Sequence, residues 1–275
     1  MCRHLAHLGP TPVTLASLVT EPPHSLLVQS YAPADMRGGG TVNADGFGVG
    51  WYVRDLLGYG TEDRARTALY RRDDPMWTDA SFLDVARAVE TTALVAAVRS
   101  ATVGMPVSTA ACAPFRGEAG GATWLFSHNG VVRGWPHSMA ELAATLPAVD
   151  LLTTEAATDS ALLWALVRAR ISAGKDPADA VAGVVADALA AAPGSRLNLL
   201  LSDGAQLVAT AVDHALSYRT HPDGGVTIAS EPLDDDGAWV PVPDGSLLVA
   251  RPGSAHDPPA VTVTALSPHA PFPTP

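Results

Sequence analysis

The sequence predicts an α+β fold in which mainly antiparallel sheets are covered by helices. Segments with the alternating pattern of strands dominate the first half of the chain, helical patterns gather in the middle, and a run of short strands follows. We find no internal repeat. Gly46, Gly48 and Gly50 do not form the G-x-G-x-x-G signature of a dinucleotide-binding fold, so a doubly wound parallel sheet is not expected.

The strands of the first half are predicted from alternating apolar side chains between turn residues. They cover residues 2–8, 47–54, 94–99 and 123–128. In the first strand Cys2 and His4 share one face and His7 points to the other, which argues against a metal site formed by these three residues. In the second strand, Gly48 and Gly50 share a face that invites close approach of another backbone or a ligand.

The helices are predicted where apolar side chains recur every three to four residues. They cover about residues 80–90, 138–146, 158–172 and 177–191. Asp179 and Asp187 make the last of these a surface-packed helix and not a membrane span. Short strands, some joined by Asp-Gly turns, complete the chain. They cover residues 197–202, 206–212, 216–219, 226–229, 246–250 and 261–265.

Composition excludes several classes of protein. The 275 residues carry 17 basic and 28 acidic side chains, and the net charge of −11 repels phosphate backbones, so nucleic acid is not an expected partner. Two cysteines, no secretory leader and no apolar stretch long enough for a bilayer predict a cytoplasmic protein without a membrane partner. We expect one domain over residues 1–266, followed by a Pro-rich, disordered tail at 267–275.

Cys2 is the most informative residue, because it directly follows Met1. The initiator methionine is normally removed before a small residue, so the mature chain is expected to begin with a thiol and an α-amine on one residue. An α-amine has a pKa near 8, against about 10.4 for lysine, so part of it is neutral at pH 7 and can accept the proton of the thiol. The alternative is that Cys2 is merely a small terminal residue.

Four more segments follow Cys2 in a characteristic order. They are residues 43–52, 98–102, 126–130 and 158–160. Together with Cys2 they resemble the class II glutamine amidotransferase domains of the N-terminal nucleophile superfamily, and the resemblance extends to at least residue 233. It implies a four-layer αββα fold, with two stacked, mainly antiparallel sheets between helices. It also implies a cysteine amidohydrolase that uses neither a cofactor nor a metal.

The resemblance gives each motif a role. The Asn129 side chain and the Gly130 backbone N–H would donate to the oxyanion formed by attack on an amide. Arg99, with Thr102 beside it, would bind the α-carboxylate of a glutamine or γ-glutamyl group. Asp159 would hold the α-ammonium of that group. A zwitterion held at both ends fixes its γ-carbonyl over the thiol.

The same residues have simpler interpretations. Asn-Gly at 129–130 is the commonest two-residue hairpin turn, and Asp159 could cap a helix; either role can coexist with the functional one. His128 is placed among the substrate-binding residues, with a structural hydrogen bond as its alternative. A triad of Ser127, His128 and Asp159 is not expected, because neighbouring strand residues face opposite ways and no G-x-S-x-G motif exists. Cys112 is expected to be a buried apolar residue, not a disulfide partner.

Two segments narrow the expected activity. Residues 45–52 and 97–106 look most like the amidohydrolases of ergothioneine biosynthesis, which release glutamate from γ-glutamyl-hercynylcysteine sulfoxide. Val103 stands where many amidotransferases carry a histidine that contacts glutamine, which disfavours free glutamine. The released amine carries a trimethylated histidine, and its quaternary ammonium could rest on Trp77 or Tyr52.

Other functions stay open. The glutaminase-like region takes nearly the whole chain and leaves no room for a domain that consumes ammonia. The alternatives are a γ-glutamyl peptide hydrolase of the glutathione-degrading type and a glutaminase subunit that passes ammonia to a partner. A different class is a glutamyl-binding regulatory module whose thiol is idle. Each enzyme would act on a small γ-glutamyl molecule.

Overall fold

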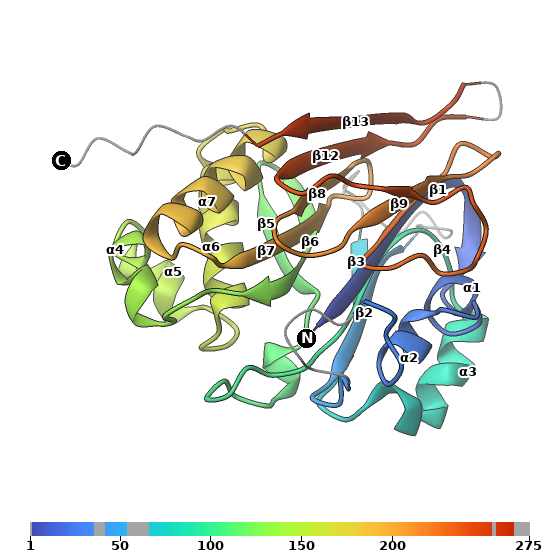
Figure 1. The fold of residues 1–275 in the computed structure, drawn as a ribbon, viewed down its shortest axis with the longest axis horizontal. Coiled ribbons are helices and arrows are strands. Elements are labelled where there is room, and N and C mark those ends of the chain that lie inside the picture. The colour runs from blue at the N-terminus through green and yellow to red at the C-terminus, as the bar shows by residue number, and fades with distance from the viewer. Residues whose placement is uncertain (1, 36–41, 54–65, 255–256, 267–275) are drawn as a thin grey trace.

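Two antiparallel sheets lie face to face in the computed structural model, with helices on both outer faces (Figure 1). The structure describes residues 2–35, 42–53, 66–254 and 257–266. In spatial order, the seven-stranded sheet contains β11 (Val240–Pro241), β9 (Ser217–Thr220), β10 (Val226–Ala229), β1 (Arg3–Thr14), β4 (Glu90–Val98), β2 (Phe47–Val53) and β3 (Arg66–Arg72). The six-stranded sheet contains β13 (Ala260–Ala265), β12 (Ser246–Arg251), β8 (Leu207–Ala211), β7 (Arg196–Ser202), β6 (Ala122–Val131) and β5 (Phe115–Ala119).

The helices form the two outer layers (Figure 1). Beside the seven-stranded sheet lie α1 (Ala16–Val19), α2 (Leu26–Gln29) and α3 (Ala80–Ala88). Beside the six-stranded sheet lie α4 (Ala140–Ala143), α5 (Ala148–Leu152), α6 (Asp159–Ser172) and α7 (Pro177–Ala191). Three short 3₁₀ helices are η1 (Met76–Thr78), η2 (Thr109–Ala111) and η3 (His137–Met139). Among the described residues, no helix combines the length and hydropathy needed to cross a bilayer.

Three apolar clusters fill the spaces between the four layers. Successive residues of β1 belong to different clusters, since Leu5 packs with the helix-side cluster and Ala6 with the cluster between the sheets. The alternation predicted for this strand is therefore confirmed, and so is the four-layer αββα arrangement.

Differences from the predicted elements concern edge strands and short helices. The strands β3 and β5 were not predicted, and each forms an edge of its sheet. Edge strands are half solvated and carry charges that break the alternating apolar pattern, as the arginines of β3 do. The first strand runs to Thr14 through an irregularity between Leu8 and Val13. The helix predicted at 138–146 is divided into η3 and α4.

Some predictions lie outside the described residues. They concern the removal of Met1 and the tail at 267–275.

The antiparallel pairing brings three chain segments to one end of the seven-stranded sheet. Arg3 at the start of β1 pairs with Val98 at the end of β4, and Val98 also pairs with Phe47 at the start of β2. The residues that precede β1 and β2 and those that follow β4 therefore meet at this end.

Candidate active site

Cys2 lies beside the residues that follow β4. Its Sγ is 3.7 Å from the carbonyl oxygen of Ser100. The neighbouring Arg99 is buried, and its Nη1 has no hydrogen-bond partner within the described part of the chain. An unpaired charged nitrogen is costly to bury, so this guanidinium is suited to receive an anion from a ligand.

The loop before β2 holds Arg99 in place. The Arg99 N–H donates to the Gly46 carbonyl (2.8 Å), and the Asp45 N–H donates to the Arg99 carbonyl (3.0 Å). The Asp45 carboxylate also accepts from the Ala101 N–H at 2.7 Å. Gly46 has φ of +116°, and a Cβ there would collide with the Cys112 sulfur, so this turn requires glycine. The turn belongs to the motif at residues 43–52, but the sequence does not indicate that it binds the backbone of Arg99.

Asn129 and Gly130 lie within β6 and not in a hairpin turn. Asn129 pairs with Asn198 and Gly130 with Leu197, both of β7, and the strand continues beyond them. The hairpin interpretation of this dipeptide is therefore wrong. A Cβ at position 130 would overlap the carbonyl of Arg196, so packing between two strands explains the glycine.

The Asn129 side chain is oriented by the first strand of the chain. Its Nδ2 donates to Ser230 Oγ at 3.0 Å, while its Oδ1 is buried without a partner among the described residues. The Ser230 hydroxyl accepts from the His4 N–H (3.0 Å) and donates to the His4 carbonyl (3.2 Å). This leaves the second amide hydrogen of Asn129 for a ligand. Sequence analysis gave Ser230 no role.

A buried ion pair anchors the start of β1. Arg3 Nε lies 2.7 Å from Glu231 Oε1, and the two side chains are only 1% and 6% exposed. Arg3 Nη1 donates to the Cys2 carbonyl at 3.0 Å, and Arg3 Nη2 also contacts the Asp35 carbonyl. The other carboxylate oxygen of Glu231 accepts from the Ala34 N–H at 2.8 Å. The pair thus fixes the backbone of Cys2, and no local pattern in the sequence indicates that these two residues meet.

Asp159 is tied to the end of β6, the strand that carries Asn129 and Gly130. Its Oδ2 accepts from the Val132 N–H (3.0 Å) and its Oδ1 from the Ser160 N–H (2.8 Å). The cap of α6 is Thr158, whose hydroxyl accepts from the Ala161 N–H at 3.2 Å. Thr158, and not Asp159, therefore caps α6, and the Asp159 carboxylate is held next to β6.

Ser127 and His128 face opposite sides of β6. Ser127 Oγ is 3.2 Å from His4 Nδ1 of the other sheet. His128 points to the helical layer, with its two ring nitrogens 3.0 Å from Ser160 Oγ and 3.0 Å from the Arg196 carbonyl. This geometry excludes a serine triad and favours the structural alternative for His128 over substrate contact.

The remaining predicted residue, Thr102, lies exposed in the loop after Arg99. Its carbonyl accepts from the Met105 N–H at 2.9 Å, which closes a turn. The loop therefore presents Thr102 to solvent, three residues after Arg99.

Burial keeps two neighbouring groups uncharged. It lowers the pKa of His4 well below its ordinary value, and the nearby His214, His128 and Arg3 act in the same direction. His4 is therefore a neutral ring at pH 7. Burial also raises the pKa of the Cys112 thiol to about 11, although Arg99 opposes this.

Cys112 is buried, as predicted, and both cysteines are free thiols. Its Sγ lies 3.2 Å from the Arg72 carbonyl and 3.4 Å from the Ser108 carbonyl. A protonated thiol that donates to carbonyl oxygens is a structural group, so Cys2 is the better candidate for the nucleophile.

The two aromatic candidates for a quaternary ammonium differ in access. Tyr52 is buried between the sheets, and its hydroxyl lies 2.7 Å from the Ser202 carbonyl and 3.0 Å from the Thr123 carbonyl. It is not available to a ligand. Trp77 is 38% exposed and packs edge-on against Tyr31, with the ring centres 5.9 Å apart.

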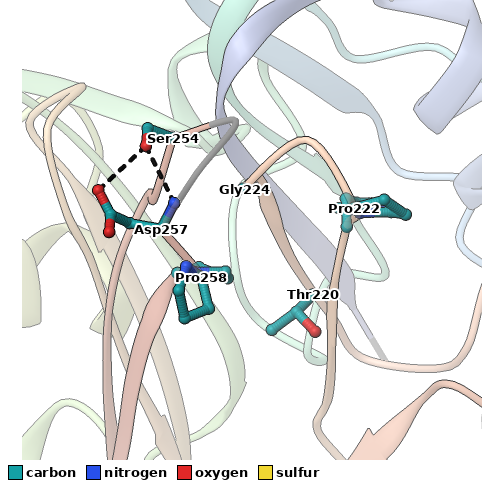
Figure 2. A pocket seen from close by; sticks show the side chains of 8 residues that line it. Thr220, Pro222, Gly224, Ser254, Asp257 and Pro258 are labelled. Atoms are coloured by element: carbon teal, nitrogen blue, oxygen red, sulfur yellow. Dashed lines mark hydrogen bonds between the residues drawn. The ribbon is translucent and has the colours of Figure 1, made fainter.

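A cavity of about 460 Å³ lies far from these residues, between the β9–β10 and β12–β13 turns (Figure 2). Its polar side chains serve each other, since the Ser254 hydroxyl binds both the carboxylate (3.2 Å) and the N–H (3.1 Å) of Asp257. No group of three potential metal ligands occurs among the described residues. The buried polar atoms around Cys2, and not a large cavity, mark the candidate active site.

The fold and this site define the class of protein. The family model of class II glutamine amidotransferases matches residues 14–224, and the chain belongs to this family. In fold, the chain is similar to glutamine phosphoribosylpyrophosphate amidotransferase of B. subtilis, with a TM-score of 0.60 and 12% identity, covering 97% of this chain and 49% of that one. The predicted family and fold class are confirmed.

The relatives of this chain carry a more specific name. It is 41% identical over 252 residues to the γ-glutamyl-hercynylcysteine sulfoxide hydrolase of Mycolicibacterium smegmatis, covering 91% of this chain and 96% of that protein. It is 40% identical over 267 residues to the hydrolase of the same name from Mycobacterium tuberculosis, covering 97% of each chain.

Proposed function

We propose that this chain hydrolyses the γ-glutamyl amide of γ-glutamyl-hercynylcysteine sulfoxide to glutamate and hercynylcysteine sulfoxide. The observation that carries the proposal is the unpaired Nη1 of buried Arg99, one residue from the Ser100 carbonyl that the Cys2 sulfur contacts at 3.7 Å. The relatives named for this reaction support the choice of substrate. The catalytic unit is residues 1–266, acting in the cytoplasm on a small molecule.

The reaction uses both the α-amine and the thiol of Cys2. Removal of Met1 frees the Cys2 α-amine, which takes the thiol proton directly or through one water. The sulfur attacks the γ-carbonyl, and the oxyanion accepts hydrogen bonds from the Asn129 side chain and the Gly130 N–H. The departing amine takes the proton from the α-ammonium. Water then cleaves the γ-glutamyl thioester and releases glutamate.

The glutamyl group is held by its charged ends. Arg99 binds the α-carboxylate, with the exposed Thr102 at the edge of this binding site. Asp159 binds the α-ammonium. Positioning of this kind can contribute up to ~7–11 kcal/mol to lowering the barrier. His128 supports the clamp, because it binds the Ser160 hydroxyl next to Asp159.

The purified protein is tested on γ-glutamyl-hercynylcysteine sulfoxide, glutathione and free glutamine, with glutamate and the released amine both identified. We expect the first substrate to have the highest kcat/KM, and mass spectrometry to find a γ-glutamyl thioester on the peptide that begins with Cys2. The matched control is Cys112→Ala, which retains the nucleophile. Preference for glutathione or glutamine would favour the other enzymes, and tight binding without turnover would favour a regulatory module.

The base is tested separately by keeping Met1 on the chain, in cells whose methionine aminopeptidase is inhibited. We expect a folded protein without turnover, because an amide nitrogen cannot accept the thiol proton. Full activity of this form would exclude the α-amine as the base.

A further inference from the structure

An ion pair joins the two sides of the molecule at the catalytic end. Arg71 Nη1, from β3, lies 2.7 Å from Glu155 Oε2, in the loop that leads to Asp159. The two side chains are 18% and 32% exposed. The pair is therefore accessible from solvent but more strongly desolvated than an ordinary surface pair.

Arg71 belongs to the row of residues next to Cys2. The pairings His4–Ala97, Ala97–Gly48 and Gly48–Arg71 run across four neighbouring strands. With strands about 4.8 Å apart, the Arg71 backbone lies ~14 Å from β1. Leu69, two residues earlier, packs in the cluster between the sheets, so Arg71 leaves the sheet on the same face.

The Arg71 guanidinium also contacts the wall of the Arg99 loop. Its Nη1 donates to the Cys112 carbonyl at 3.4 Å. The Cys112 sulfur in turn fills the space beside Gly46, whose carbonyl holds Arg99. The ion pair is thus connected through Cys112 to the loop before β2, which holds Arg99.

We propose that the Arg71–Glu155 pair binds the betaine end of the departing amine; this inference rests on the proposed function. The hercynyl group carries a carboxylate and a trimethylammonium on one carbon. The Arg71 fork suits the carboxylate, to which it can donate two hydrogen bonds. The trimethylammonium has no N–H, so it needs only a nearby negative charge, and Glu155 supplies one.

The dimensions of the substrate agree with this placement. About nine covalent bonds separate the scissile carbonyl carbon from the betaine carbon, a reach of roughly 10 Å at ~1.3–1.5 Å per bond. The Arg71 side chain covers the remaining distance from β3. The pair would then distinguish this substrate from glutamine, whose leaving group is ammonia alone.

The test compares two substrates: γ-glutamyl-hercynylcysteine sulfoxide and an analogue with a bare imidazole in place of the hercynyl group. We expect Arg71→Met and Glu155→Gln to lower kcat/KM for the full substrate about 10- to 100-fold, and to lower it far less for the analogue. The matched control is Arg168→Met, because Arg168 and Asp150 form a pair of similar exposure, 28% and 31%, elsewhere in the chain. This control should leave the ratio of the two kcat/KM values unchanged.

The double variant Arg71→Glu with Glu155→Arg keeps an ion pair but reverses its direction. If the pair only holds the two layers together, this variant should recover both stability and activity. If the pair binds the betaine, kcat/KM for the full substrate should stay low relative to kcat/KM for the analogue. Equal losses on both substrates, or recovery by the reversed pair, would overturn the inference alone. A wild-type protein inactive on both substrates would overturn the proposed function as well.

Discussion

The start and the middle of β1 carry buried polar clusters of opposite character. At its start, near Cys2, Arg99 Nη1 and Asn129 Oδ1 have no partners among the described residues. Five positions further along, one hydroxyl serves two rings: Thr227 Oγ1 lies 2.9 Å from His7 Nδ1 and 2.7 Å from His221 Nε2. The first cluster is open, because Arg99 Nη1 can pair with a ligand anion, and the second is closed on itself.

This difference shows what identifies a site in this fold. The 460 Å³ cavity adjoins the closed cluster, since His221 lines it, yet the polar atoms there have partners within the protein. The exceptions are two buried nitrogens that have no partner among the described residues: His7 Nε2, in a ring that burial keeps neutral, and Arg219 Nε, whose guanidinium binds Asp234 through Nη1. Unpaired buried polar atoms reduce stability and are tolerated where a ligand will satisfy them. Changes in the open cluster near Cys2 should therefore alter the rate of the reaction. Changes in the closed cluster around His7 should alter the stability of the fold.

The largest effect is expected for Cys2→Ala. Turnover should fall at least about 10⁴-fold, because the nucleophile is lost. The free energy of unfolding should change by less than about 0.5 kcal/mol, since within the described part of the chain the sulfur makes only a weak contact with the Ser100 carbonyl. Urea unfolding and steady-state kinetics measure the two effects. A large loss of stability would show that the two clusters along β1 do not differ as described.

Asn129→Ala should lower kcat about 10²- to 10³-fold through loss of one oxyanion donor. Alkylation of Cys2 by iodoacetamide should proceed at the wild-type rate, because the nucleophile and its base are intact. A change in KM with an unchanged kcat would instead place Asn129 in ground-state binding.

In the closed cluster, acid should reduce the stability of the fold through His7. Burial and the neighbouring His221 lower the pKa of His7 to about 4, against 6.5 in an unfolded chain, while Asp223 opposes this. The unfolded state therefore takes up a proton first, and stability should fall as the pH drops from 6.5 to 4 and then level off. At 1.36 kcal/mol per pKa unit the loss is about 3 kcal/mol.

Urea unfolding at several pH values measures this loss, and His7→Gln provides the control. The variant should lose the acid-dependent part attributed to His7, while the buried His4 still contributes its own. An unchanged pH profile in the variant would contradict the assignment to His7.

The smallest effect is expected for Ser230→Ala. Loss of its hydroxyl frees the Asn129 side chain to turn, so kcat should fall roughly tenfold with KM retained, which corresponds to about 1.4 kcal/mol in the barrier. Ser230→Thr should restore most of the rate, because it keeps the hydroxyl. If stability falls while kcat does not, Ser230 belongs with the closed cluster and only supports the fold.

The open cluster near Cys2 was more predictable from the sequence than the closed cluster around His7. Cys2, Arg99, Asn129 and Asp159 were predicted from an ordered set of motifs, in which each residue type matches a chemical task. The structure brings Cys2 beside Arg99 and ties Asp159 to the strand of Asn129. The supporting contacts were not predicted, because they join distant positions. Arg3 and Glu231, for example, are 228 residues apart.

The sequence by itself determined the family, the candidate nucleophile and the face on which each strand residue lies, because these depend on residue chemistry and on local periodicity. Only the tertiary structure decided that Asn129–Gly130 lies within a strand, that Thr158 and not Asp159 caps α6, and that Arg71 meets Glu155. Periodicity specifies the direction in which a side chain points from its own element. The partner that it contacts there depends on how two sheets and their helices pack. A local sequence pattern contains no information about this packing.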